Sequence, residues 1–230
     1  MNQPYRNIGF FFLLLFFLVL AGFTPRITNT PFFGYFASAP RFEHVPAVIH
    51  FHAITCVMWF SLVITQAFLI RASRYNLHRL LGKISILVFA LFATSTLLVI
   101  NYQYTRDLFE VSERAALAAV LPVILGLLFT VLFYALALLK RRNLYQHVAF
   151  MLATALTIAT NGLTRLGIYL VGNLSGVLWA AMFIYASLIG FWLYEKFKLK
   201  RPALSSPYLL VLVLFLVNHV LGALGSQTAA

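Results

Sequence analysis

Residues 115–139 read AALAAVLPVILGLLFTVLFYALALL, a stretch without a single charge that ends against Lys140, Arg141 and Arg142. An α-helix rises about 1.5 Å per residue, so a stretch of this length spans the roughly 30 Å hydrocarbon core of a bilayer. Backbone polar groups in hydrocarbon must bond to one another, which a helix achieves within one segment. The stretch therefore predicts a transmembrane helix that stops at a basic loop.

The same pattern recurs along the chain. Apolar runs long enough to cross a membrane lie at residues 8–23, 46–70, 84–102, 115–139, 148–171, 176–194 and 208–224. These runs extend from one end of the chain to the other, so we expect one domain over residues 1–230. Arg6 precedes the first run as in a signal peptide, but no Ala-X-Ala cleavage site directly follows the run and the run is long for a signal, which favours an uncleaved span. The predicted class is all-α: a polytopic bundle of about seven transmembrane helices.

The composition supports lipid as the solvent. Hydrophobic residues make up 62% of the chain and charged residues 10%, whereas soluble domains carry about 25% charged residues. A net charge of +12 would suggest nucleic acid as the partner of a soluble protein. Here the positive charges lie in short loops between apolar runs, so we expect the lipid bilayer as partner and no nucleic acid. The single cysteine, Cys56, excludes an intrachain disulfide.

Charge alternates from loop to loop and predicts the orientation. The connections after the second, fourth and sixth runs are rich in lysine and arginine, and the connection after the fifth run has no charge. The connection after the third run holds Asp107, Glu110 and Glu113. Because cytoplasmic loops carry the excess of positive charge, the N-terminus is predicted inside and the C-terminus outside.

Polar side chains within the runs are the candidate site residues, because such residues usually face the bundle interior and serve function. At about 100° per residue, positions eighteen apart return to one helix face. The fifth run thus carries a stripe of His147, Met151, Asn161 and Arg165. The second run carries His52, Trp59 and Gln66 near one face, with simple packing favoured for Trp59. Sorted by depth, these side chains predict an outer cluster of His52, Asn161, Arg165 and His219 and an inner cluster of Gln66, His78 and His147.

The polar side chains within the runs supply imidazole, amide and guanidinium groups. No acidic residue lies at the centre of a run, which argues against a proton-coupled or cation-coupled carrier. Neutral imidazoles ligate haem iron or transition metals, so we predict haem or metal binding by His52, His78, His147 and His219, with Arg165 on a haem propionate. Glycine-rich phosphate loops, Cys-X-X-Cys, His-Glu-X-X-His and a serine nucleophile elbow are absent from the sequence, so no particular enzyme reaction is predicted.

Two other functions remain open. The first is a transporter or sensor that binds a small anionic or amphipathic ligand around Arg165, in a pocket lined by Trp59, Gln66, Met151 and Asn161. The second is a structural subunit that packs against a larger membrane complex. The haem or metal hypothesis predicts electron transfer or oxidase assembly, and it predicts visible absorbance or stoichiometric metal.

Short motifs over residues 46–171 resemble those of an uncharacterised family of predicted bacterial membrane proteins, a domain of unknown function. His78 and Arg79 followed by Gly82 resemble its His-Arg-X-X-Gly motif, and His147 with Met151 resembles a second motif that ends at Arg165. The family often has His-Arg-Arg-Trp-Met where this chain has His-Val-Ala-Phe-Met at 147–151. Small membrane proteins linked to haem-copper oxidase assembly are similar more distantly. The resemblance implies a bacterial inner (cytoplasmic) membrane and no established activity.

Overall fold

A computed structural model describes residues 4–28, 45–110, 112–172 and 175–229, and these residues form helices and turns with no strand among them. The helices are α1 (Ile8–Thr28), α2 (Ala47–Arg71), α3 (Tyr75–Glu110), α4 (Glu113–Leu139), α5 (Leu144–Val171), α6 (Gly176–Leu193) and α7 (Pro207–Ala229). A π-helical turn, η2 (Tyr194–Lys198), and a 3-10 turn, η3 (Ala203–Ser205), connect α6 to α7. The predicted all-α class is confirmed.

Within the described residues, six helices are long and apolar enough to cross a membrane: α2, α3, α4, α5, α7 and the segment Gly176–Lys198. The described apolar part of the first helix, Ile8–Phe23, is shorter. Six of the predicted runs therefore correspond to helices of membrane-spanning length, and the chain is a multi-pass helical protein suited to a lipid bilayer.

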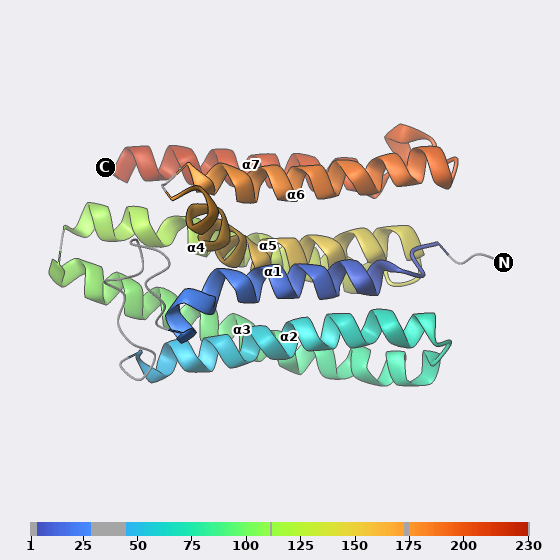
Figure 1. The fold of residues 1–230 in the computed structure, drawn as a ribbon, viewed down its shortest axis with the longest axis horizontal. Coiled ribbons are helices and arrows are strands. Elements are labelled where there is room, and N and C mark those ends of the chain that lie inside the picture. Colours follow the sequence, from blue (N-terminus) through green and yellow to red (C-terminus); the bar gives the residue numbers. More distant parts are fainter. Residues whose placement is uncertain (1–3, 29–44, 111, 173–174, 230) are drawn as a thin grey trace.

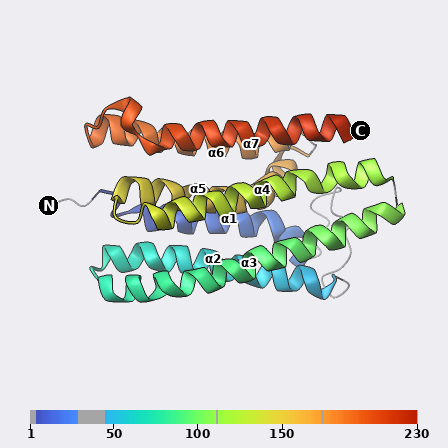
Figure 2. The same ribbon diagram turned by 180° about the vertical axis from the view of Figure 1, so that it is seen from behind.

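The helices lie in three tiers (Figure 1). The pair α6 and α7 forms one outer tier, the pair α2 and α3 forms the other, and α1, α4 and α5 lie between them, as the reverse view in Figure 2 also shows. Helix α5 is central. Of the residues in its most apolar stretch, 56% are buried, against 17% of those in α7. The turns after α2, α4 and α6 lie at the same end of the bundle as the N-terminus. The basic connections therefore all lie at that end, which we call the basic end.

Local signals set the helix ends. Ser112 Oγ accepts a hydrogen bond from the Ala115 amide before α4, and Asn143 Oδ1 accepts one from the Gln146 amide before α5. Such caps satisfy amides that have no partner within the helix. Gly172 ends α5 with φ 77, a conformation that favours glycine. Helix α3 extends beyond the predicted run 84–102 at both ends, because backbone hydrogen bonding continues where the sequence turns polar.

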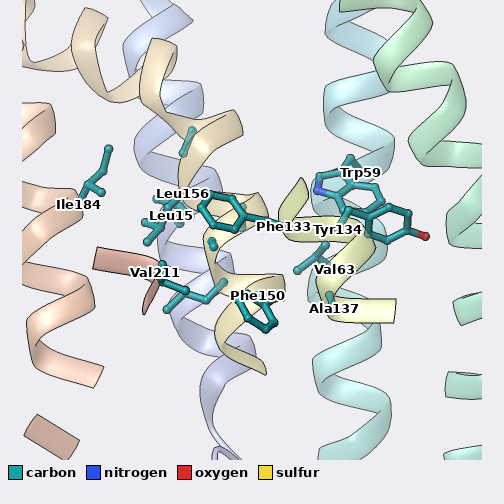
Figure 3. Packing of buried hydrophobic residues seen from close by; sticks show 14 of the residues in the cluster. Leu15, Trp59, Val63, Phe133, Tyr134, Ala137, Phe150, Leu156, Ile184 and Val211 are labelled. Carbon is teal, nitrogen blue, oxygen red and sulfur yellow. The ribbon is translucent and has the colours of Figure 1, made fainter. Parts of the chain in front are cut away.

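The core joins all three tiers (Figure 3). Trp59 and Val63 of α2 pack towards Tyr134 of α4, and Leu15 of α1 lies beside Leu156 of α5. Each of these side chains is buried. The packing of α5 against its neighbours relies on small residues, since Ala149, Ala153, Ala155 and Ala159 are fully buried. Small side chains allow close approach of helix backbones, as in membrane bundles generally.

Candidate functional site

Three helices carry polar side chains near the basic end of the bundle, and a fourth contributes a backbone oxygen. Gln66 lies on α2, His78 on α3, and His147 near the start of α5, while Ala137 of α4 contributes its backbone oxygen. We call Gln66, His78 and His147 the inner cluster. The described contacts join His78 to the backbone of Gln66, and join His147 to the backbone of Ala137.

Both imidazoles of the inner cluster are oriented by the same kind of hydrogen bond. The Nδ1 atom of His78 lies 3.3 Å from the backbone oxygen of Gln66, and the Nδ1 atom of His147 lies 2.8 Å from that of Ala137. A carbonyl oxygen can only accept, so each Nδ1 carries a proton and donates it. In a neutral imidazole the other nitrogen, Nε2, then has a lone pair available.

Gln66 adds a third acceptor. Its side chain is buried, and Oε1 has no hydrogen-bond partner in the described part of the chain. Gly82 lies against the same side chain: a Cβ atom at Gly82 would be 3.7 Å from Gln66 Nε2. A buried polar atom without a partner costs about 1–3 kcal/mol, and this oxygen is one of five such side-chain atoms in the described residues. The inner cluster therefore contains three neutral acceptor atoms, namely two imidazole Nε2 atoms and one amide oxygen.

Trp59 is part of the core beside this cluster. It is fully buried and lies edge-on to Phe89 and Tyr134, with ring centroids 5.1 Å apart in both pairs. The Tyr134 hydroxyl in turn hydrogen-bonds Ser85 Oγ at 2.7 Å. These contacts hold the Trp59 ring in the core between α2, α3 and α4.

The contacts of His52 join α2 to α3. Its Nδ1 lies 3.1 Å from Ser95 Oγ, and its Nε2 lies 3.4 Å from Cys56 Sγ. Ser95 Oγ also lies 2.7 Å from Thr55 Oγ1, and Ser95 donates to the backbone oxygen of Phe92. The histidine is thereby held within an α2–α3 contact of small polar groups.

The other residues of the predicted outer cluster have contacts on different helices. The Arg165 guanidinium of α5 lies over the Phe23 ring of α1, 5.1 Å from its centroid. His219 Nδ1 of α7 lies 2.7 Å from the Tyr185 hydroxyl of α6. Asn161 is exposed, although helical phase places it near the His147 stripe. Helix phase predicts a shared face, but the neighbours of each turn decide which contacts form. In the described residues, no group of three or more His, Cys, Asp or Glu side chains could hold a metal.

Sequence reasoning missed a buried carboxylate. Glu195 in η2 is fully buried, and its Oε1 accepts hydrogen bonds from the Tyr5 hydroxyl and from Arg201 Nη1, the latter at 3.4 Å. The Arg201 guanidinium also lies 3.7 Å from the centre of the Tyr145 ring. We call Tyr5, Glu195 and Arg201 the clasp. One signal was present in the sequence: Glu195 is the only acidic residue in the basic connections.

We predict that the folded protein loses stability at alkaline pH because of the clasp. Burial raises the pKa of the Tyr5 hydroxyl above its ordinary value, and the neighbouring Tyr208 and Glu195 raise that pKa further. The folded protein keeps a proton that the unfolded chain releases, so this contribution is complete below about pH 10 and declines as the pH rises above it. The test measures the midpoint of unfolding in detergent from about pH 8 to pH 11. This midpoint should fall less steeply with rising pH for Tyr5→Phe than for the wild type or for the control variant Tyr75→Phe. Equal slopes would contradict the assignment.

Comparisons with protein families, with curated proteins and with solved structures found no match for this chain.

Proposed function

We propose that this chain is a bacterial inner-membrane protein that binds a transition metal, as a bare ion or as haem iron, through the Nε2 atoms of His78 and His147. Its role would be electron transfer or the assembly of an oxidase. The proposal includes seven spans, with α1 as the first, an N-terminus inside and a C-terminus outside. The basic end supports this orientation, because positive loops stay on the cytoplasmic side.

The observation that carries the proposal is the pair of Nδ1–H to carbonyl hydrogen bonds. Histidines that ligate metals almost always donate their second ring N–H to a carbonyl or a carboxylate, which fixes the tautomer and aims Nε2 at the metal. Both histidines of the inner cluster have this arrangement, and they come from different helices. Facing helices of a bundle commonly build metal and cofactor sites in this way.

The test compares asparagine variants of the two histidines. Asparagine retains an N–H donor near the position of Nδ1 and removes the Nε2 lone pair. We expect His78→Asn and His147→Asn each to lose most of the bound metal, and the double variant to lose little more, because one site needs both ligands. The matched control is His219→Asn on α7, which should retain wild-type metal content.

The measurement is elemental analysis of detergent-purified protein together with an absorbance spectrum before and after reduction. A Soret band that depends on His78 and His147 identifies haem iron, and stoichiometric metal without that band identifies a bare ion. Circular dichroism checks that each variant is folded. Protein from cells replete in metal and haem that carries neither, or metal retained by the folded double variant, would overturn the proposal.

A further inference from the structure

The connection between α6 and α7 carries cationic and large apolar side chains side by side on its surface. It consists of η2, η3 and the residues that join them, and it lies at the basic end, on the outer tier of the bundle (Figure 1). Lys196, Lys198 and Lys200 are exposed. Phe197 lies between two of these lysines in the sequence and is 68% exposed, and Leu204 of η3 is 92% exposed. This surface therefore combines three positive charges with two apolar side chains.

Two contacts hold the connection against the rest of the bundle. Arg201 Nη1 lies 3.4 Å from Oε1 of Glu195, which is the only acidic residue at the basic end in the described part of the chain. The indole N–H of Trp192, at the end of α6, donates to the backbone oxygen of Ala203 at 3.1 Å. Because Arg201 takes the one carboxylate of this end, the exposed lysines of the connection keep their charge uncompensated.

The rest of the basic end adds charge of the same sign. Twelve of the 17 lysine and arginine residues lie there, at positions 6, 71–83, 140–142 and 196–201. Against them stands one described carboxylate, Glu195, so this end holds a balance of +11 within the net charge of +12. Each lysine or arginine close to an anionic membrane surface strengthens binding by about fivefold. The charge therefore favours an anionic partner at this end.

The apolar side chains decide between a soluble anion and an anionic lipid. Lysines alone attract either one. Phe197 and Leu204 would stay in contact with water beside a free phosphate, whereas the acyl chains of a lipid would remove them from it. The membrane-spanning segment Gly176–Lys198 ends within the connection, so these side chains lie where hydrocarbon gives way to headgroups. Apolar side chains interspersed with lysines are typical of that boundary.

From these observations we propose that the α6–α7 connection is a binding surface for anionic phospholipids. Lys196, Lys198 and Lys200 contact the lipid phosphates, and Phe197 and Leu204 lie among the upper parts of the acyl chains. The occupant is a lipid of the leaflet that the basic end faces. This inference depends neither on the metal site nor on which side of the membrane the basic end lies.

Trp192 is a reporter built into the connection, because Lys196 Nζ lies 5.7 Å from the centroid of its ring. The full-length protein is reconstituted into vesicles of phosphatidylcholine and phosphatidylglycerol, with bromine on the chains of one lipid or the other. Bromine quenches tryptophan fluorescence on contact, so the two series compare the lipids beside the reporter. Every protein carries Trp179→Phe, because Trp179 is exposed on α6 about 20 Å from Trp192 along the helix. Trp59 is fully buried.

We expect phosphatidylglycerol to be favoured over phosphatidylcholine at Trp192 by about tenfold or more. Replacing Lys196, Lys198 and Lys200 together by glutamine should reduce this preference to about twofold or less. The other cations of the basic end lie on other connections, and salt screens charges over about 8 Å at physiological ionic strength. Raising the salt concentration should therefore lower the preference of the unsubstituted connection.

The matched control replaces Lys140, Arg141 and Arg142 by glutamine. It removes the same charge from the turn between α4 and α5, at the same end of the bundle, and should retain most of the preference at Trp192. Circular dichroism checks that each variant is folded. Loss of preference in the three-lysine variant alone supports the proposal.

Four results would overturn it. Equal quenching by the two brominated lipids would mean that no anionic lipid is selected, as expected of a surface that binds an acidic soluble protein. A preference that survives in the folded three-lysine variant would exclude these lysines as the ligands. Equal loss in both triple variants would assign the attraction to the whole end instead of the connection. Inorganic phosphate that removes the preference, where sodium chloride of equal ionic strength does not, would indicate a site for a free anion.

Discussion

Gly22→Ala is expected to lower the stability of the folded bundle by about 3 kcal/mol or more, because it forces α1 away from α5. A Cβ atom at Gly22 would overlap the backbone oxygen of Gly162. The obstacle is backbone on a neighbouring helix, so no change of rotamer relieves it. In the reverse direction, a Cβ atom at Gly162 would lie 2.7 Å from Val19 Cγ1, a side-chain atom that moves more easily.

Alanine substitutions at Gly22, Gly162 and Gly126 are expected to give a graded series of effects on stability. Gly162→Ala should cost less than Gly22→Ala, and Gly126→Ala should be neutral or stabilise by up to about 1 kcal/mol, because a Cβ atom at Gly126 meets nothing within 4 Å. Unfolding by a denaturing detergent, followed by circular dichroism in mixed micelles, gives the order. A Gly22→Ala protein as stable as Gly126→Ala would show that α1 and α5 do not approach as closely as described.

Arg201→Ala is expected to destabilise the protein by about 3–5 kcal/mol, because it leaves the Glu195 carboxylate buried without a counter-ion. The side chains of Arg201 and Glu195 are 22% and 1% exposed, so water compensates little. The substitution also removes the packing of the guanidinium on Tyr145. The matched control is Lys198→Ala, an exposed residue of η2, which should change stability by less than about 0.5 kcal/mol.

A double-variant cycle isolates the charge effect. Glu195→Gln keeps an oxygen that accepts from Tyr5 and removes the negative charge that Arg201 offsets. Combined with Arg201→Ala, it should recover part of the lost stability, so that the two changes are strongly non-additive. Additive costs in the same denaturation assay would mean that Arg201 stabilises the fold by packing alone.

The helices were predictable because each apolar run must satisfy its backbone internally, and charged residues mark where a run stops. The bounds were less predictable. Helix α3 begins at Tyr75 and ends at Glu110, since helical hydrogen bonding does not stop where hydrophobicity does. The predicted apolar run ends at residue 194, where the π-helical turn η2 begins, so hydrophobicity gave no indication of this turn.

The candidate site was predictable to different degrees at its two depths. Gln66, His78 and His147 flank tight basic turns that all lie at one end, so depth alone groups them. His52, Arg165 and His219 have similar depth, yet their described contacts go to α3, α1 and α6. The position of a residue in its run predicts its depth along the helix. It does not predict which helices lie beside one another, and that arrangement decides which side chains meet. Glu195 was missed because its burial depends on Tyr5, which is 190 residues away in the sequence.

That separation has a consequence for biosynthesis. Chains are elongated at about 5–20 residues per second, so Tyr5 is made about 10–40 seconds before Glu195. During this interval the tyrosine has no carboxylate to bind, and the helices made first assemble without the clasp. The contact between Tyr5 and Glu195 is therefore among the last to form, and its closure reports that the final hairpin has reached its place in the bilayer.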